Sequence, residues 1–255
     1  MIIMYKILEI YIFILSTIYM SDNHCITVIS YNIRWESMDN ITTRKNIIQN
    51  ITNAISEYKP DIIGLQEANK WQKILKHVNF KKYNVAHNTS GVESMITMWN
   101  RNRFDKIYVN ASEFEEGRPF IIMYLKDKTN NNILCVINVH SSHNTNTQKY
   151  IFDIINNKLK KINIYFNRII ILGDFNRNVT IDTKSNYIIK NKNKNFKMKS
   201  FYLEKKTCCS MLGYGHKFNY DHVMDSLKPI DKIVVNDKWY NKISSDHIMI
   251  VSKLA

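Results

Sequence analysis

The run Arg-Ile-Ile-Ile-Leu-Gly-Asp-Phe-Asn at residues 168–176 constrains the fold more than any other stretch of the chain. Its four consecutive apolar residues, three of them β-branched, predict a strand that is buried on both faces. Gly173 then lets the backbone turn closely before a carboxylate and an amide. We therefore expect Asp174 and Asn176 at the rim of a sheet, where ligands bind in α/β folds. Taken alone, a strand followed by an Asx turn explains these residues equally well.

Two helix-then-strand units predict a layered fold. Apolar residues at helical spacing predict a helix over 44–58, and the strand 62–66 that follows ends at Glu67. A second amphipathic helix over 150–162 leads into the strand 169–172 and Asp174. The repeated order indicates related halves of an α/β structure. Further strands are expected at 26–31, 120–125, 133–139, 233–235 and 248–251.

The length and the scarcity of turn residues favour one domain after a short N-terminal segment. The 255 residues include only 3 Pro and 6 Gly, and no flexible linker divides them, so we expect a single domain over 25–255. Residues 1–24 are an upstream extension or a leader. Their apolar run resembles a signal peptide, but Glu9 interrupts it. A secreted protein and an intracellular one translated from Met20 both stay open.

The formal net charge of +14 favours a polyanionic partner such as nucleic acid or an anionic surface. The stretch 184–199 is rich in lysine and asparagine. We expect it to be a solvated loop, and a loop that contacts phosphate is the alternative.

The four cysteines have no spacing typical of metal ligands, so a structural zinc site is not expected. Cys135 lies in an apolar run and is expected to be a buried thiol. The adjacent Cys208 and Cys209 could pair with distant cysteines if the protein is secreted.

Polar side chains able to carry out chemistry stand at five strand exits. Each one by itself is more often a cap or a turn residue than a catalyst. Five strand ends of the same character are hard to explain as turns alone, so we expect them to form one site. They are Asn32, Glu67, His140, Asp174 with Asn176, and Asp246 with His247.

Five short motifs resemble those of the DNase I-like endonuclease/exonuclease/phosphatase superfamily. They occur in the order of that superfamily and span nearly the whole chain after Cys25. The resemblance implies an α/β (α+β) fold, a four-layered sandwich of two mainly antiparallel β-sheets with helices outside and the active site at one edge. The motifs are Tyr-Asn-Ile-Arg (31–34), Leu-Gln-Glu (65–67), Asn-Val-His-Ser (138–141), Gly-Asp-Phe-Asn (173–176) and Ser-Asp-His (245–247).

The resemblance implies a divalent metal site. Glu67 is a hard oxygen donor suited to Mg²⁺, which takes one or two carboxylates from protein and keeps several waters. Asn32 and Asp246 complete this neighbourhood in the superfamily. Mn²⁺ is an alternative cation because it favours similar oxygen-rich sites.

The same resemblance assigns the residues that act on the phosphodiester. Asp174 would orient or deprotonate the attacking water, and Asn176 would hold a phosphate oxygen or belong to the shell of the metal. His140 and His247 would contact the scissile phosphate, one exchanging a proton and the other steadying the transition state.

Each histidine needs a carboxylate that fixes its tautomer. Glu93 stands where DNase I-type members carry the glutamate that pairs with the histidine matching His140, although alone it could be a solvent-facing strand end. Asp221 resembles the aspartate that pairs with the histidine matching His247. Asp231 is a rival for that second role, and motif spacing favours Asp221.

Arg118 resembles the basic residue that grips a substrate phosphate, and Arg34 could add a second contact. A surface ion pair is the alternative for both arginines. For Arg34 it is as good an explanation as function.

These residues predict a Mg²⁺-dependent phosphodiesterase that hydrolyses nucleic acid, specifically a DNA endonuclease, acting as a monomer without a stable protein partner. The alternative is a phosphatase or a phospholipase C-type hydrolase of the same fold, acting on inositol phosphates or sphingomyelin. A binding protein that has lost activity is the least favoured reading because every expected catalytic residue type is retained.

Overall fold

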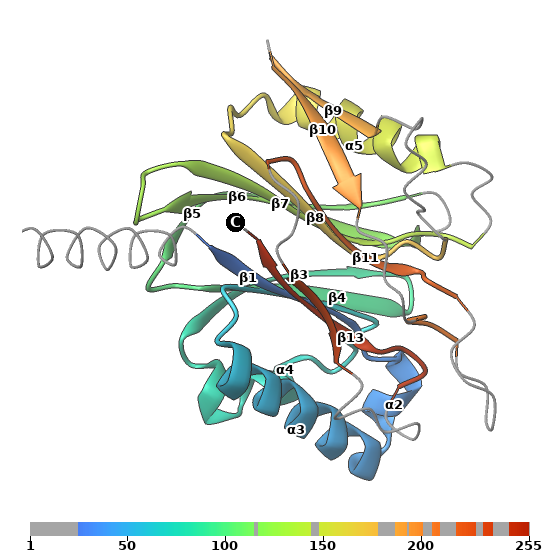
Figure 1. The fold of residues 1–255 in the computed structure, drawn as a ribbon. Helices are drawn as coiled ribbons and strands as arrows, with labels where there is room; N and C mark the ends of the chain where they lie inside the picture. The colour runs from blue at the N-terminus through green and yellow to red at the C-terminus, as the bar shows by residue number, and fades with distance from the viewer. Residues whose placement is uncertain are drawn as a thin grey trace, which may run out of the picture.

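The computed structural model describes residues 25–114, 117–143, 148–177, 187–192, 194–200, 206–209, 218–227, 232–236 and 245–254. Two β-sheets pack face to face, and helices lie on the outer side of each sheet (Figure 1). The expected four-layered sandwich is therefore confirmed. Within the described part of the chain, no helix is both long enough and apolar enough to cross a membrane.

The first sheet contains six strands in the order β12-β13-β1-β2-β4-β3. Only β1 and β2 are parallel among its paired strands. Helix α3 (Ile41–Tyr58) covers its outer face, together with the short α2 (Trp35–Asp39), α4 (Gln72–Leu75) and a 3-10 turn at Val78–Phe80. The strands are β1 (Ile26–Asn32), β2 (Ile62–Gln66), β3 (Tyr83–Ser90), β4 (Glu93–Asn100), β12 (Lys232–Asn236) and β13 (Met249–Leu254).

The second sheet contains seven strands in the order β5-β6-β7-β8-β11-β10-β9. Only β7 and β8 are parallel in it. Helix α5 (Gln148–Ile162), yellow in Figure 1, covers its outer face. The strands are β5 (Phe104–Glu113), β6 (Pro119–Asp127), β7 (Ile133–His140), β8 (Arg168–Asp174), β9 (Tyr187–Asn191), β10 (Lys194–Ser200) and β11 (Asp221–Asp225).

Burial of apolar side chains in three layers holds the sandwich together. One cluster fills the space between the sheets, and the other two lie between each sheet and its helices. In β8, Ile170 and Leu172 point into the central layer, whereas Ile169 and Ile171 point toward α5. This burial of both faces explains why residues 169–172 of β8 are all apolar and do not alternate with polar residues.

Several strands of the structure were not predicted from the sequence. We expected a solvated loop at 184–199, and this expectation is wrong, because β9 and β10 form an antiparallel hairpin there. Phe196 and Met198 are buried on either side of the exposed Lys197. This alternation is the period of a strand, and the abundance of lysine masks it.

The chain direction brings many strand ends to one edge of the sandwich. The parallel pairs β1–β2 and β7–β8 carry their C-terminal ends to the same side, where His140 lies opposite Asp174 in register. The neighbouring strands β4, β6, β11 and β13 run antiparallel to these pairs and therefore start at that edge. Residues far apart in sequence thus meet at this edge.

Gly173 is required by the geometry of this edge. Its φ is +137°, and a Cβ atom there would lie 2.0 Å from the carbonyl oxygen of Val139. We predict that Gly173→Ala lowers the free energy of unfolding by about 3–5 kcal/mol, because backbone strain and a backbone clash add together.

The matched control for Gly173 is Gly91→Ala. Gly91 has a φ of +56°, but nothing lies within 4 Å of the added carbon. Its replacement should cost about 1 kcal/mol. Urea unfolding of both variants measures the difference, and equal losses would contradict the predicted clash.

Candidate active site

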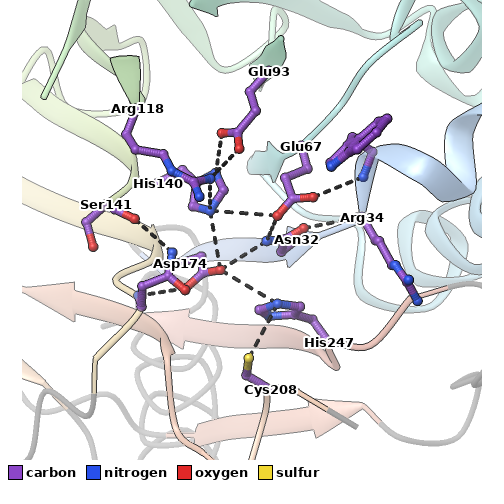
Figure 2. Close-up of polar contacts among 12 residues, drawn as sticks. Asn32, Arg34, Glu67, Glu93, Arg118, His140, Ser141, Asp174, Cys208 and His247 are labelled. Carbon is purple, nitrogen blue, oxygen red and sulfur yellow. Dashed lines mark hydrogen bonds and ion pairs between the residues drawn. The ribbon is translucent and has the colours of Figure 1, made fainter. Parts of the chain in front are cut away.

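Asp174, at the C-terminal end of β8, lies at the centre of a polar cluster (Figure 2). Its Oδ1 accepts a hydrogen bond from the backbone N–H of Asn176 (2.7 Å), and its Oδ2 accepts one from Nδ2 of Asn32 (3.0 Å). Burial raises the pKa of this carboxyl, but His247, His140 and these hydrogen bonds outweigh burial and lower the pKa. Asp174 is therefore a buried, ionised acceptor at neutral pH.

Asn32 joins the ends of the two sheets. Its Nδ2 donates to Oε1 of Glu67 (2.9 Å) as well as to Asp174, and the backbone N–H of Trp35 donates to Oε2 of Glu67 (3.0 Å). Glu67 and Arg34 both adopt positive φ values, 53° and 57°. Such backbone conformations are costly for residues other than glycine and cluster at functional sites.

His140, at the end of β7, is held by a carboxylate and faces two others. Its Nδ1 lies 3.0 Å from Oε2 of Glu93, and its Nε2 lies 3.7 Å from both Glu67 Oε1 and Asp174 Oδ2. Burial lowers the pKa of His140, but Glu93, Asp174 and Glu67 raise it above the usual value. Arg118 forms an ion pair with Glu93 and approaches His140 Nε2 at 3.2 Å.

His247 occupies the opposite side of Asp174. Its Nδ1 lies 2.9 Å from Oδ2 of Asp221, and its Nε2 lies 3.7 Å from Asp174 Oδ2. Burial lowers the pKa of this imidazole, but the carboxylates of Asp221 and Asp174 raise it. The structure thus places Asp221 against His247, and the rival Asp231 lies outside the described residues.

Three further residues expected at the site lie nearby with other partners. Asp246 is one-third exposed, and its Oδ1 lies 4.0 Å from His247 Nε2. The Nδ2 of Asn176 donates to the carbonyl oxygen of Ser141 (2.7 Å), which fixes the turn after β8. Arg34 points away from Asp174 in Figure 2 and forms an exposed ion pair with Glu36 (3.4 Å).

Two residues that contribute to the site were not predicted from the sequence. Ser245 donates from its hydroxyl to the carbonyl oxygen of Asn32 (2.8 Å) and accepts the backbone N–H of His247 (3.1 Å), so it ties two site residues together. Cys208 places its sulfur 3.5 Å from His247 Nε2. Membership of the Ser-Asp-His motif was the available signal for Ser245, whereas nothing in the spacing of the cysteines pointed to Cys208.

His222 lies next to Asp221 in β11 but does not face the cluster. Its Nε2 donates to the carbonyl oxygen of Asn219 (2.9 Å) or of Arg177 (3.2 Å), and burial lowers its pKa to about 4. The unfolded chain therefore takes up this proton first as the pH falls below about 6.5, so stability is lost on acidification. We predict a loss of about 2 kcal/mol between about pH 7.5 and about pH 5 from this group.

Urea unfolding at the two pH values, with EDTA present, tests this prediction. Between the two pH values, His222→Gln should lose about 2 kcal/mol less stability than the wild type, because glutamine keeps a donor and carries no titratable group. The comparison with the wild type cancels the opposite contribution of His247, whose raised pKa makes stability rise on acidification. The control is His77→Gln at an exposed position, which should leave the pH dependence unchanged. An unchanged dependence in His222→Gln would contradict the assignment.

Carboxylates and imidazoles thus gather at the edge where the two sheets bring their strand ends together. The model of the Endonuclease/Exonuclease/phosphatase family matches residues 29–247, and the chain belongs to that family, whose members are hydrolases that act on phosphoester bonds. No curated protein matches the sequence.

Several solved structures share the fold at low sequence identity. D. rerio TDP2 complexed with a single-strand DNA product is 14% identical, with a TM-score of 0.66 over 90% of this chain and 98% of that one. ANGEL2, a 2′,3′-cyclic phosphatase, is 14% identical, with a TM-score of 0.65 over 90% and 95%. A mannosyl-6-phosphatase of Bacteroides thetaiotaomicron is 16% identical, with a TM-score of 0.63 over 90% and 99%.

Proposed function

We propose that this hydrolase is a Mg²⁺-dependent phosphodiesterase that cleaves DNA internally. The observation that carries the proposal is the convergence of two imidazoles on one carboxylate oxygen. The Nε2 atoms of His140 and His247 each lie 3.7 Å from Asp174 Oδ2. One group that transfers a proton and another that stabilises charge must both reach the same phosphate. The two imidazoles converge beside Glu67, since His140 Nε2 also lies close to its carboxylate.

The charges around the site fit a divalent cation. Five carboxylates gather there against one guanidinium and two imidazoles, which leaves two negative charges even when both imidazoles are protonated (five minus three). Oxygen donors of this kind suit Mg²⁺, and Mn²⁺ would be accepted too. We propose that Glu67, Asn32 and Asp246 hold the cation. The carboxylates are Glu67, Glu93, Asp174, Asp221 and Asp246, and the cationic groups are Arg118, His140 and His247.

Asp174 is suited to orient a water for attack on phosphorus. Both of its oxygens are fixed by donors, Asn176 N–H and Asn32 Nδ2, so the carboxylate cannot rotate away. Because the carboxylate is ionised, it can accept a hydrogen bond or a proton from that water. When bound, the cation supplies charge neutralisation at a phosphate oxygen.

The two imidazoles are suited to hold the phosphate and the proton that moves during cleavage. Asp221 fixes Nδ1 of His247 and leaves Nε2 to face the reacting group. Glu93 does the same for Nδ1 of His140. Arg118, beside Glu93 and His140, would contact a phosphate oxygen, as would the amide of Asn176. For Arg34 the exposed pairing with Glu36 supports the surface alternative.

DNA is the proposed substrate because of the charge of the protein and the pairing of one histidine. A net charge of +14 attracts a polyanion, and the Glu93–His140 pair is typical of the DNase I-like branch. Since all charge attraction to the substrate can come from a single chain, we propose a monomer. The alternative is a phosphatase or phospholipase C-type activity, because the similar structures include a cyclic phosphatase and a sugar phosphatase.

The experiment is incubation of the purified protein with supercoiled plasmid, with Mg²⁺, with Mn²⁺ and with EDTA. Cation-dependent nicking that is lost in His247→Ala supports the proposal. Intact plasmid together with phosphate release from inositol phosphates, or headgroup release from sphingomyelin vesicles, would support the alternative. No reaction with any substrate would contradict both.

A further inference from the structure

The adjacent cysteines Cys208 and Cys209 lie against the proposed catalytic histidine. Their sulfurs are bonded to one another, so pairing with a distant cysteine does not occur. Cys208 is 1% exposed, and its Sγ lies 3.5 Å from Nε2 of His247. Figure 2 shows this sulfur below the imidazole ring of His247 and the carboxylate of Asp174 above it. The cysteine pair therefore lies next to the proposed hydrolytic site.

Backbone hydrogen bonds hold the cysteine segment in place without using the sulfurs. The N–H of Cys209 donates to the carbonyl oxygen of Asp246 (2.9 Å), and the N–H of Ile248 donates to the carbonyl oxygen of Thr207 (2.8 Å). Cys208 also forms an isolated antiparallel bridge with Phe218. Because these bonds flank His247 on both sides, the sulfur of Cys208 stays near the imidazole whether the cysteines are oxidised or reduced.

Once the bond between the two sulfurs is reduced, the three side chains would offer two sulfurs and one nitrogen to a thiophilic metal. The two sulfurs and an imidazole nitrogen of His247 all lie within 4.8 Å of one another. A tetrahedral zinc with ordinary Zn–S and Zn–N bonds places a sulfur and a nitrogen ligand about 3.5 Å apart. The separation of Cys208 Sγ from His247 Nε2 has this value, 3.5 Å.

The opposite nitrogen of His247 completes this pattern. A metal-binding histidine ordinarily donates its other N–H to a carboxylate, which fixes the tautomer and raises the basicity of the ligand. Nδ1 of His247 lies 2.9 Å from Asp221 Oδ2, and the backbone N–H of Asp221 is held by the hydroxyl of Thr207 (3.2 Å). The imidazole is thus oriented with Nε2 toward the sulfur.

We propose that reduced Cys208 and Cys209, together with His247, form a second metal site that takes a thiophilic cation such as Zn²⁺ and switches hydrolysis off. The inhibitory effect rests on the proposed function, because it requires that Nε2 of His247 act on the substrate. One nitrogen cannot hold a metal and contact a phosphate at the same time. Thiolates are soft ligands that favour Zn²⁺, whereas the oxygen donors around Glu67 suit Mg²⁺. The two sites therefore differ in the cation that they prefer.

The proposed site can bind a metal only when Cys208 and Cys209 are reduced. An external thiol breaks the Cys208–Cys209 bond by attack on one sulfur, and a second thiol completes the exchange. Two thiols supply two electrons and two protons, become one disulfide, and leave two cysteine thiols. Each cysteine then releases its proton to water as it binds the metal. The disulfide form offers no thiolate and should be insensitive to zinc.

Binding is tested first, without any measurement of activity. The reduced full-length protein is titrated with Cd²⁺, and the cadmium–thiolate charge-transfer absorption is followed. We expect saturation at one Cd²⁺ per chain, no signal in the oxidised protein, and none in Cys208→Ser/Cys209→Ser. His247→Asn should weaken binding by about tenfold or more. The control Cys25→Ser removes a thiol outside the site and should match the wild type.

Two results of this titration would overturn the proposal. One is an absence of thiolate absorption in reduced wild-type protein, which is decisive without any substitution. The other is unchanged Cd²⁺ affinity in folded His247→Asn protein, which would show that the imidazole is not a ligand. Since no substrate is involved, neither result depends on whether the protein cleaves DNA.

Inhibition is tested next, as plasmid nicking in excess Mg²⁺ with increasing Zn²⁺. Half-inhibition of the reduced wild type should need at least about tenfold less Zn²⁺ than that of the oxidised wild type or of Cys208→Ser/Cys209→Ser. Equal Zn²⁺ sensitivity in all three would place the inhibitory zinc elsewhere and overturn the switch.

Discussion

His247→Gln is expected to nick plasmid about 10³-fold more slowly than the wild-type protein, the middle of the range for loss of a positioned acid–base group. The reason is geometric. Asp221 fixes Nδ1 of the ring at 2.9 Å, so Nε2 is held 3.7 Å from Asp174 Oδ2, where the phosphate is proposed to lie. Glutamine can donate a hydrogen bond there but cannot exchange a proton at neutral pH.

The measurement is the initial rate of nicking at saturating Mg²⁺. His87→Gln is the matched control, because this histidine is exposed and stacks on Trp71 outside the cluster. It should retain the wild-type rate. Asp221→Asn keeps the shape of the partner and removes its charge, so its rate should fall between those of His247→Gln and the wild type. A His247→Gln rate within about threefold of wild type would contradict a direct chemical role.

Glu67→Gln is expected to lower the affinity for the activating cation by about 100-fold or more, since even residues that only support metal ligands cost 10–100-fold. The carboxylate is replaced by a neutral amide of the same size. Glutamine has one acceptor oxygen, so it can keep one of the two hydrogen bonds that Glu67 accepts, from Asn32 Nδ2 at Oε1 or from the Trp35 N–H at Oε2. Glu67 is only half-buried, so the loss of the other bond is a small cost. The fold should therefore stay intact while the charge that attracts the cation is lost.

The dependence of nicking on Mg²⁺ concentration measures this change, and Mn²⁺ binding followed by electron paramagnetic resonance measures it without a substrate. Glu36→Gln is the control, because Glu36 is an exposed acid near the site that pairs only with Arg34 among the ion pairs of the described residues. Its cation dependence should match that of the wild type. A Glu67→Gln protein with unaltered Mn²⁺ affinity would exclude Glu67 as a ligand.

The parts of the fold that could be predicted have strong local signals. The helix expected over 44–58 is α3 at Ile41–Tyr58, and the buried strand expected at 169–172 is β8 at Arg168–Asp174. Both bury long apolar surfaces, and their periodicity is therefore unambiguous. Strand β5 was not predicted, because it is largely exposed and its polar residues hide the alternation. Strand β3 was not predicted either, because its buried residues do not alternate regularly with exposed ones.

The residues of the candidate site and two of their pairings, Glu93 with His140 and Asp221 with His247, follow from the motifs, but other contacts of the site do not. The motifs identify Asn32, Glu67, His140 and Asp174, and the structure brings them within hydrogen-bonding or ion-pair distance of one another. The contact between Cys208 and His247 could not be predicted, because it depends on backbone pairing between segments 39 positions apart. Tertiary pairing of this kind leaves no periodic trace in sequence.

One divalent cation is proposed to bind where the two sheets bring their strand ends together. Anomalous diffraction from crystals grown with Mn²⁺ tests it most directly, because the peak reports the position of the ion itself. We expect a peak with an oxygen of Glu67 in its coordination sphere and Asn32 and Asp246 beside it. A peak elsewhere, with none at Glu67, would contradict it.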